Sequence, residues 1–263
     1  MTTNQMQDAP SLDLSSKVAV VTGASGDLGR VMARTLARCG ADMALHFHSN
    51  REKADALRAE IEAIGRRAIV VQADITRRDD VFSMRESVER ELGGADILVN
   101  NAVAQYEWKS VLEQSEEDFE SQFRSCVLQN VLMAQAFVPG MIERKRGGRI
   151  IGINTECALQ CAPSQSAYVA GKRGMDGVLR VLAREVGPHG ITVNQVAPGW
   201  TISDRDRAKG LEHNADYEKN VPLRRRGTDQ EIANAVAFFA SDLAAFVTGA
   251  FLPVSGGTVM PSI

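Results

Sequence analysis

Short apolar runs alternate along this chain with longer amphipathic stretches, and this alternation restricts the folds open to it. The runs are rich in β-branched residues and cover 18–21, 43–45, 68–71, 97–99, 150–153, 191–193 and 250–252. Amphipathic stretches typical of helices lie near 28–39, 51–64, 78–92, 116–142, 165–187 and 228–241. Such repeated strand–helix–strand order predicts an α/β fold with a doubly wound parallel sheet, covered by helices on both faces in three layers.

The domain organisation is expected to be simple. A chain of 263 residues is within reach of one hydrophobic core, and no repeat or Pro/Gly/Ser-rich linker divides it. We therefore expect a loose N-terminal tail over residues 1–12 and a single domain over 13–263.

Composition excludes several classes of function. The net charge of −3 argues against a nucleic-acid binder or a basic membrane-surface protein. No uninterrupted apolar run approaches the about 18 residues of a membrane span, and the N-terminus lacks the apolar core of a secretory signal. The four cysteines have no metal-ligand spacing. We expect a cytoplasmic protein with reduced thiols, no metal, no nucleic-acid partner and no membrane.

A glycine-rich segment, 22–30, follows the first apolar run and precedes a helical stretch. Glycines at this place let the backbone approach a pyrophosphate, as in Rossmann-type sheets, although glycine also serves ordinary strand-to-helix turns. Asp27 would repel a diphosphate, and we expect its carboxylate to cap the helix instead. The expected phosphate-loop residues are Gly23, Ser25, Gly26, Asp27, Leu28 and Gly29.

The end of the second run bears on the choice of cofactor. NAD sites usually place an acid there to hold the ribose hydroxyls, whereas residues 46–51 contain none. His48 and Ser49, with Asn50 and Arg51, could instead hydrogen-bond a 2′-phosphate. The segment favours NADP and leaves NAD open; alternatively Ser49 or Asn50 only caps the next helix.

Tyr168 and Lys172 stand four residues apart in the predicted helix at 165–187, and so share one helix face. A phenol titrates near 10, too high for easy proton transfer at neutral pH, and a neighbouring cation is expected to lower its pKa. Thr155, just past the fifth run, offers a hydroxyl able to polarise a carbonyl. The Tyr–Lys pair alone is weak evidence, because it arises by chance in many solvated helices.

Together these motifs resemble the short-chain dehydrogenase/reductase family in its single-domain form, over roughly residues 12–260. The matching segments are 22–29, Asp74–Ile75, Asn100–Asn101–Ala102, 168–172, Val193–Asn194, 197–200, 222–227, 248–250 and Gly256–Gly257.

The resemblance implies an NAD(P)-dependent oxidoreductase of alcohols and carbonyls, with the hydride chemistry supplied by the cofactor. Tyr168 would be the general acid/base, Lys172 would lower its pKa and hold the nicotinamide ribose, and Thr155 would hydrogen-bond the substrate oxygen. Cofactor contacts are implied at Asp74 and Ile75 for adenine, Asn101 and Ala102 for its ribose, and Pro198, Gly199 and Thr201 for nicotinamide.

Three positions depart from the family pattern. Asp27 replaces a glycine of the loop, and Val103 stands where a glycine would follow Ala102. Cys126 takes the place of a catalytic asparagine whose carbonyl helps to hold a water. Asn130, one helical turn on, could compensate in part, or could be a packing residue; unchanged turnover in Asn130→Ala would argue against compensation.

The function that these motifs and the resemblance favour is NADPH-linked reduction of a 3-oxoacyl- or polyketide-type ketone. An NAD-linked sugar or polyol dehydrogenase is one alternative, and a cofactor-binding protein with impaired catalysis is another. Specificity is expected in a mobile lid at about 200–220, with Gln105, Tyr106 and Trp108 as an aromatic wall or an ordinary surface loop. Residues 224–226 are predicted to be solvated, and the helices at 116–142 and 165–187 to build a homotetramer.

Overall fold

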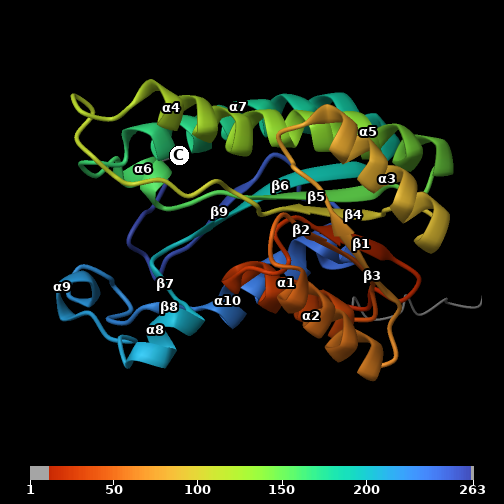
Figure 1. Ribbon diagram of the computed structural model, residues 1–263, viewed down its shortest axis with the longest axis horizontal. Coiled ribbons are helices and arrows are strands. Elements are labelled where there is room, and N and C mark those ends of the chain that lie inside the picture. The colour runs from red at the N-terminus through yellow and green to blue at the C-terminus, as the bar shows by residue number, and fades with distance from the viewer. Residues whose placement is uncertain (1–11, 262–263) are drawn as a thin grey trace, which may run out of the picture.

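The computed structural model describes residues 12–261, and its centre is a seven-stranded parallel sheet (Figure 1). The strand order is β3-β2-β1-β4-β5-β6-β9. The strands are β1 (Val18–Val21), β2 (Asp42–Phe47), β3 (Ala68–Gln72), β4 (Ile97–Asn100), β5 (Gly148–Ile153), β6 (Ile191–Pro198) and β9 (Phe251–Val254). Each expected run is therefore a strand, and the predicted doubly wound parallel sheet is confirmed.

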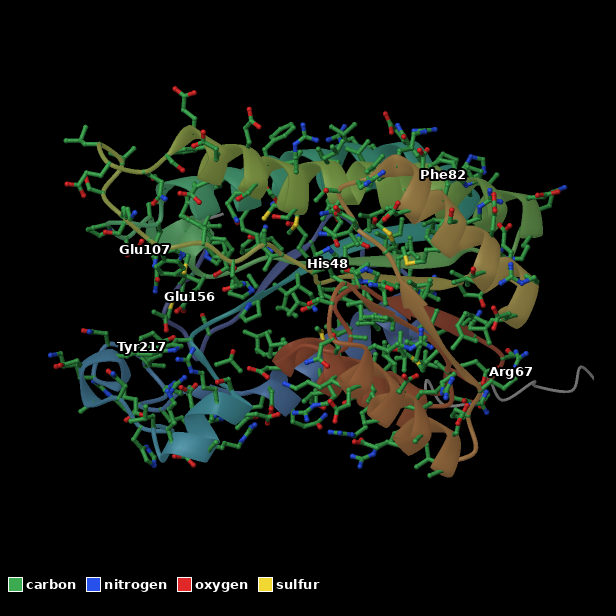
Figure 2. All side chains as sticks on the ribbon, in the orientation of Figure 1. His48, Arg67, Phe82, Glu107, Glu156 and Tyr217 are labelled. Atoms are coloured by element: carbon green, nitrogen blue, oxygen red, sulfur yellow. The ribbon has the colours of Figure 1, made fainter. Side chains whose placement is uncertain are left out.

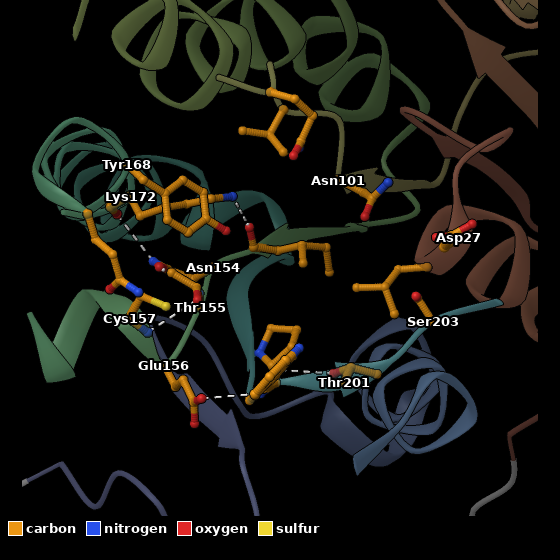
Figure 3. Close-up of a pocket in the computed structure, with 18 of the residues that line it drawn as sticks. Asp27, Asn101, Asn154, Thr155, Glu156, Cys157, Tyr168, Lys172, Thr201 and Ser203 are labelled. Atoms are coloured by element: carbon orange, nitrogen blue, oxygen red, sulfur yellow. Dashed lines mark hydrogen bonds between the residues drawn. The ribbon is translucent and has the colours of Figure 1, made fainter. Parts of the chain in front are cut away.

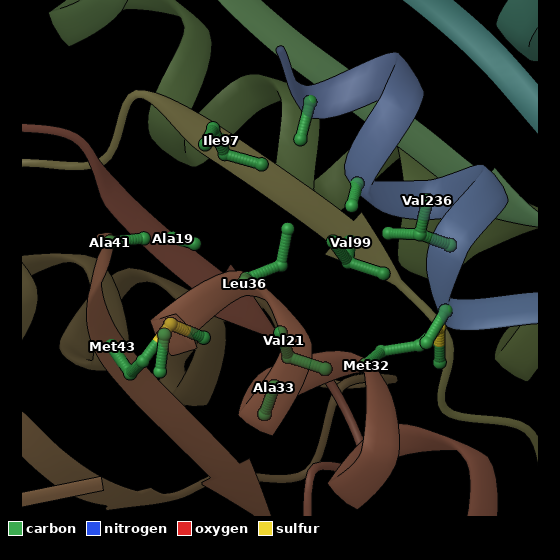
Figure 4. Close-up of a cluster of buried hydrophobic side chains, with 14 of the residues drawn as sticks. Ala19, Val21, Met32, Ala33, Leu36, Ala41, Met43, Ile97, Val99 and Val236 are labelled. Atoms are coloured by element: carbon green, nitrogen blue, oxygen red, sulfur yellow. The ribbon is translucent and has the colours of Figure 1, made fainter. Parts of the chain in front are cut away.

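Helices cover both faces of the sheet, as predicted (Figure 1). On one face lie α1 (Asp27–Arg38), α2 (Arg51–Ala63) and α10 (Asp229–Ala240), and on the other lie α3 (Arg78–Leu92), α5 (Gln129–Arg144) and α7 (Ser166–Val186). Figure 4 shows the first of these cores, where Met32 and Leu36 of α1 pack with Val99 of β4 and Val236 of α10. Strands buried on both faces explain why the runs are continuously apolar rather than alternating.

Strand order reverses between β1 and β4, which are neighbours although β2 and β3 separate them along the chain. Ligands of open α/β sheets bind at such a point, beyond the carboxyl ends of the strands. The segments that follow β1, β4, β5 and β6 all lead to this edge, so the sheet brings the expected site residues together.

The helical stretch expected at 116–142 is continuous but not uniform. It consists of α4 (Glu116–Gln122), a π-helical segment η1 (Phe123–Leu128) and α5. Residues 116–144 are long and apolar enough to cross a membrane by length and composition, but 61% of the most apolar window is buried inside the protein. The stretch therefore has the burial of a core helix.

The segment expected as a lid, 200–220, carries short elements of its own. They are β7 (Thr201–Ile202), α8 (Asp204–Lys209) and α9 (Ala215–Glu218), and β7 pairs with β8 (Gly227–Thr228). A capping box at Ser203 begins α8. Mobility of this segment stays a prediction, and the expected tail over 1–12 falls outside the described residues except for Leu12. Short helices also form at α6 (Cys157–Gln160), η2 (Gly187–His189) and η3 (Asp242–Ala244).

Candidate active site

A cavity of about 760 Å³ opens at the carboxyl edge of the sheet (Figure 3). Its lining comes from the segments after β1, β4, β5 and β6, from α7 and from the segment around α8 and α9. This volume lies within the range of small-molecule and cofactor sites. Thr155, Tyr168 and Lys172 all line it, together with Asp27, Asn101, Pro198, Gly199 and Thr201.

The glycine loop is tightly closed between β1 and α1. Gly23 has a φ of +66°, a conformation that favours glycine, and a Cβ on Gly29 would lie 2.1 Å from the Gly23 carbonyl oxygen. The expected helix cap is wrong: α1 begins at Asp27, its N-cap is Gly26, and no side chain caps it. The Asp27 side chain does not cap the helix; it is exposed and borders the cavity (Figure 3).

Thr22 joins the loop to the segment after β4. Its hydroxyl oxygen accepts from the backbone N–H of Asn101 at 2.9 Å and of Ala102 at 3.0 Å, and donates to Gln129 Oε1 at 2.8 Å. Asn101 Nδ2 in turn donates to the Thr22 carbonyl at 2.9 Å. The two segments expected to hold the cofactor are thus fastened to each other by buried bonds.

His46 also supports the glycine loop, and sequence reasoning missed it. Nδ1 accepts from the Gly23 N–H at 2.9 Å, and Nε2 lies 3.0 Å from the Ala73 carbonyl oxygen. A ring that accepts at Nδ1 and donates at Nε2 is neutral. Burial favours this form and lowers the pKa of His46 to about 4. The sequence signal that could have indicated this role was a histidine within an otherwise mostly apolar strand.

Acidification is expected to weaken the fold through His46. The unfolded ring titrates near 6.5 and the folded one near 4, so the unfolded chain binds the extra proton between these values. The contribution of neutral His46 to the free energy of unfolding is therefore fully present above about pH 6.5. It falls by about 3 kcal/mol as the pH drops through 4. Urea unfolding at pH 7 and pH 4.5 measures it. His46→Leu should lose most of this pH-dependent difference, whereas His189→Gln, on an exposed turn, should keep it; an equal fall in His46→Leu would contradict the assignment.

Of the residues expected at the adenosine end, His48 and Asp74 lie apart from this cavity, whereas Asn101 lines it. A hollow of about 400 Å³ is lined by His48 and Asp74, with Gln72, Ala73, Asp80 and Ser83. Although burial works to raise it, hydrogen bonds from the Thr76 hydroxyl and N–H hold the pKa of Asp74 below its usual value. Ser49, the residue after His48, is exposed, and Ile75, the residue after Asp74, is buried. Asn50 caps α2, as one alternative predicted.

Thr155, Tyr168 and Lys172 meet where the end of β5 faces α7 (Figure 3). Lys172 is 3% exposed, and its Nζ donates to the Ile153 carbonyl at 2.5 Å and lies 5.7 Å from the centre of the Tyr168 ring. The Thr155 hydroxyl accepts from the Cys157 N–H at 3.2 Å, and both Thr155 and Tyr168 line the cavity. Two hydroxyls and one ammonium thus converge on one end of the cavity.

The expectation that Lys172 lowers the pKa of Tyr168 is wrong for this structure. Burial raises the pKa of the phenol well above its usual value, and it also lowers the pKa of the Lys172 ammonium. Desolvation penalises both charged forms, and the ammonium bonds to a backbone carbonyl rather than to the phenol. Tyr168 is consequently a neutral proton donor at neutral pH.

Cys126 lies in the π-helical segment, 1% exposed, against Gly171 of α7. Its carbonyl accepts from Asn130 Nδ2 at 2.7 Å, and Asn130 Oδ1 accepts from Asn100 Nδ2 at 2.7 Å. Burial raises the pKa of the Cys126 thiol. The Asn130 amide therefore bonds to the carbonyl expected to hold the water, and whether it compensates for the missing asparagine stays a prediction.

Two residues near the lid were not foreseen. Ser203, beside Thr201, also lines the cavity. The prediction that 224–226 are solvated is wrong for Arg226, which is 2% exposed and donates to the carbonyls of Thr201 and Leu211 and to Asp206 Oδ2 at 2.8–3.0 Å. A buried guanidinium with these partners organises the segment beside the cavity.

Comparisons with known proteins agree with this geometry. A family model described as enoyl-(acyl carrier protein) reductase matches residues 23–259. The chain is 36% identical over 255 residues to the 3-oxoacyl-[acyl-carrier-protein] reductase FabG of Staphylococcus epidermidis, covering 93% of this chain and all of that one. It belongs to the short-chain dehydrogenase/reductase family.

Solved structures support the same assignment. A short-chain type dehydrogenase/reductase from Mycobacterium marinum is 30% identical with a TM-score of 0.85, covering 95% of this chain and 98% of that one. A blue fluorescent protein from a metagenomic library, solved in complex with NADPH, is 35% identical with a TM-score of 0.86, covering 94% and 100%. The chain is an NAD(P)-dependent oxidoreductase that acts on CH–OH or C=O groups.

Proposed function

We propose that the protein reduces a ketone of the 3-oxoacyl or polyketide type with NADPH. The observation that carries this is the pair of hydroxyls, Thr155 and Tyr168, beside a buried lysine at the end of a cavity that begins at a glycine loop. The 3-oxoacyl reductase relatives and the NADPH-bound neighbour support it.

The glycine loop suits a dinucleotide, because a side chain at Gly29 would fill the space that lets the backbone turn toward a pyrophosphate. The cofactor, when bound, supplies the hydride. The residues proposed to hold it are Gly23, Ser25, Gly26, Asp27, Leu28, Gly29, His48, Ser49, Asp74, Ile75, Asn101, Ala102, Tyr168, Lys172, Pro198, Gly199 and Thr201, with Ser203 added from the cavity lining.

In the proposed mechanism the ketone oxygen lies between the two hydroxyls. Thr155 donates a hydrogen bond that orients and polarises the carbonyl, and Tyr168 gives its proton to the oxygen as the carbon is reduced. The phenol is protonated at neutral pH, as the proton donor in reduction must be. Lys172 would hold the nicotinamide ribose when the cofactor is bound, and Asn130 positions the Cys126 carbonyl.

NADPH consumption in the presence of a 3-oxoacyl ester tests the function. Turnover with NADPH and little with NADH is expected. Preferred oxidation of polyols with NAD would support the alternative dehydrogenase, and tight cofactor binding without any turnover would support the impaired-catalysis alternative.

A carboxylate at position 48 should reverse the cofactor preference. His48 and Ser49 are exposed just after β2, at the place where NAD sites usually carry an acid and this chain carries none. His48→Asp is expected to weaken NADPH binding about 100-fold and to leave NADH binding equal or tighter, because like charges repel while ribose hydroxyls can donate to the acid. Titration of nicotinamide fluorescence measures both affinities. Glu52→Gln on the exposed face of α2 is the control, and an unchanged NADPH affinity in His48→Asp would contradict the assignment.

We also propose a cytoplasmic homotetramer. Phe123 and Val181, on the two helical stretches expected to form the interface, are 57% and 56% exposed in the single chain. Burying such side chains between copies would stabilise an assembly. Light scattering should give four times the chain mass, and a clean monomer would contradict the proposal.

A further inference from the structure

The tyrosines and tryptophans of this chain gather in one place. The sequence contains three tyrosines and two tryptophans, and all five line the active-site cavity: Tyr106, Trp108, Tyr168, Trp200 and Tyr217. They come from the loop after β4, from α7 and from the segment after β6. Tyr168 already has a role as the proton donor. The other four aromatic rings have no role in the proposed mechanism, and they bear on what the cavity binds.

Trp108 presents a flat surface next to the reacting phenol. Its ring is stacked on that of Tyr168, with centroids 5.9 Å apart and planes at 27°, and the side chain is 48% exposed. The loop that carries it has no helix or strand, but the Tyr106 hydroxyl accepts from the Tyr168 N–H at 2.8 Å and anchors it to α7. The predicted aromatic wall is therefore attached to the catalytic helix.

Trp200 presents a second surface, 47% exposed, from the segment after β6. The Tyr217 ring meets it edge-on at 5.3 Å, and the Arg226 guanidinium lies 4.5 Å from its ring centre. The Trp200 backbone N–H and the Tyr217 hydroxyl both donate to Glu156 Oε1, at 3.2 and 2.9 Å, and Figure 2 shows Glu156 and Tyr217 facing each other. Glu156 is buried and directly follows Thr155, so the Trp200 backbone and the Tyr217 ring that packs on the indole are tied to the residue next to a reacting hydroxyl.

The charges around the cavity point to an uncharged ligand. Among the described lining residues Lys172 is the only cation, and it is buried and bonded to the Ile153 carbonyl. The acids Asp27, Glu156 and Asp229 border the same space. A carboxylate or phosphate on the substrate would lose its hydration without gaining a cation, which is costly.

We propose that the cavity selects an uncharged planar ring ketone, an aryl or fused-ring ketone whose ring packs against Trp108 and Trp200, over a flexible open-chain ketone. Rigid aromatic walls favour flat ligands, because offset-stacked and edge-on ring contacts add to area burial and a rigid ligand loses little conformational freedom. The inference rests on the proposed ketone reduction and narrows its substrate class.

Competition between two matched ketones tests it. With NADPH and the full chain, kcat/KM for 2-tetralone should exceed that for ethyl 3-oxohexanoate, which has the same number of non-hydrogen atoms, by about tenfold or more. Methyl 4-acetylbenzoate should likewise be reduced at least tenfold more efficiently than 4-acetylbenzoate. Each ratio is measured on one preparation, so the fraction of correctly folded enzyme cancels.

Substitutions test which side chains cause the preference for ring ketones. Trp108→Ala and Trp200→Ala should each bring the tetralone-to-ester ratio at least fivefold closer to one, whereas Trp108→Phe and Phe246→Ala, the latter fully exposed and outside the cavity, should keep it. Reduction of both ketones with the ester preferred, or a ratio unchanged in both alanine variants, would overturn this inference and leave the proposed function standing. No reduction of either ketone, despite NADPH binding, would overturn both.

Discussion

Tyr168→Phe is expected to lower the kcat of ketone reduction by about three orders of magnitude while lowering NADPH affinity by no more than about tenfold, the size of effect of one lost hydrogen bond. General acid catalysis contributes roughly 10²- to 10⁴-fold, and this substitution removes the donor oxygen alone. The phenol is the neutral hydroxyl at the end of the cavity, and burial keeps it protonated. Thr155 can hold the substrate oxygen, and its own hydroxyl accepts from the Cys157 N–H. Single-turnover reduction and an NADPH titration on the same preparation give the two quantities.

Tyr217→Phe is the matched control, because it removes from the same cavity a phenol that bonds to Glu156 and to the Trp200 backbone N–H. Its kcat should fall by less than about tenfold, the size of effect expected for one lost hydrogen bond. Equal losses in both variants would show that Tyr168 acts by packing rather than by giving a proton. Loss of NADPH binding in Tyr168→Phe would show that the phenol serves the cofactor before it serves the substrate.

Gly29→Ala should abolish measurable NADPH binding and lower the free energy of unfolding by about 3 kcal/mol or more. The added Cβ would lie 2.1 Å from the Gly23 carbonyl oxygen and 2.8 Å from its carbon, well inside contact distance, and both atoms belong to the backbone. Relief requires moving the loop or the start of α1, and both are held by the Gly23 N–H bond to His46 and by the Thr22 network. Overpacking of this kind costs typically 1–3 kcal/mol, and more where the neighbour is rigid backbone.

Gly177→Ala supplies the control within α7. Nothing lies within 4 Å of a Cβ at that position, and its backbone is helical, so alanine should raise stability by about 0.5–1 kcal/mol and leave NADPH affinity unchanged. Urea unfolding and fluorescence titration compare the pair. NADPH affinity in Gly29→Ala equal to that of the wild type would refute the proposed phosphate loop.

Local patterns were sufficient to predict most of the secondary structure. The run 18–21 is β1, buried at every position, and the stretch expected at 51–64 is α2, which begins after the Asn50 cap. Runs buried on both sides and amphipathic stretches differ in period, so neighbouring residues alone separate strands from helices. The π-helical segment at Phe123–Leu128 was not foreseen, because its sequence reads as ordinary helix.

Prediction was less complete at the site, and burial accounts for two of its three failures. Helical spacing was enough to pair Tyr168 with Lys172, but the direction of the Tyr168 pKa was wrong because burial, rather than the nearby ammonium, dominates it. Asp27 was assigned a capping role from its place in the sequence, whereas the helix begins one residue too early for it to cap. Arg226 was judged by its charged neighbours and lies buried among carbonyls.

The order of residues along the chain is sufficient for the strands, the helices, the glycine loop and the Tyr–Lys pair, because each depends on neighbours within a few positions. Three features depend instead on contacts between residues far apart in the sequence: the neutral state of His46, the raised pKa of Tyr168, and the gathering of all five tyrosines and tryptophans around one cavity. His46, for example, contacts both Gly23 and Ala73. Burial and dielectric environment are properties of the packed molecule, so the charge state of a side chain is set once the sheet has brought distant segments together.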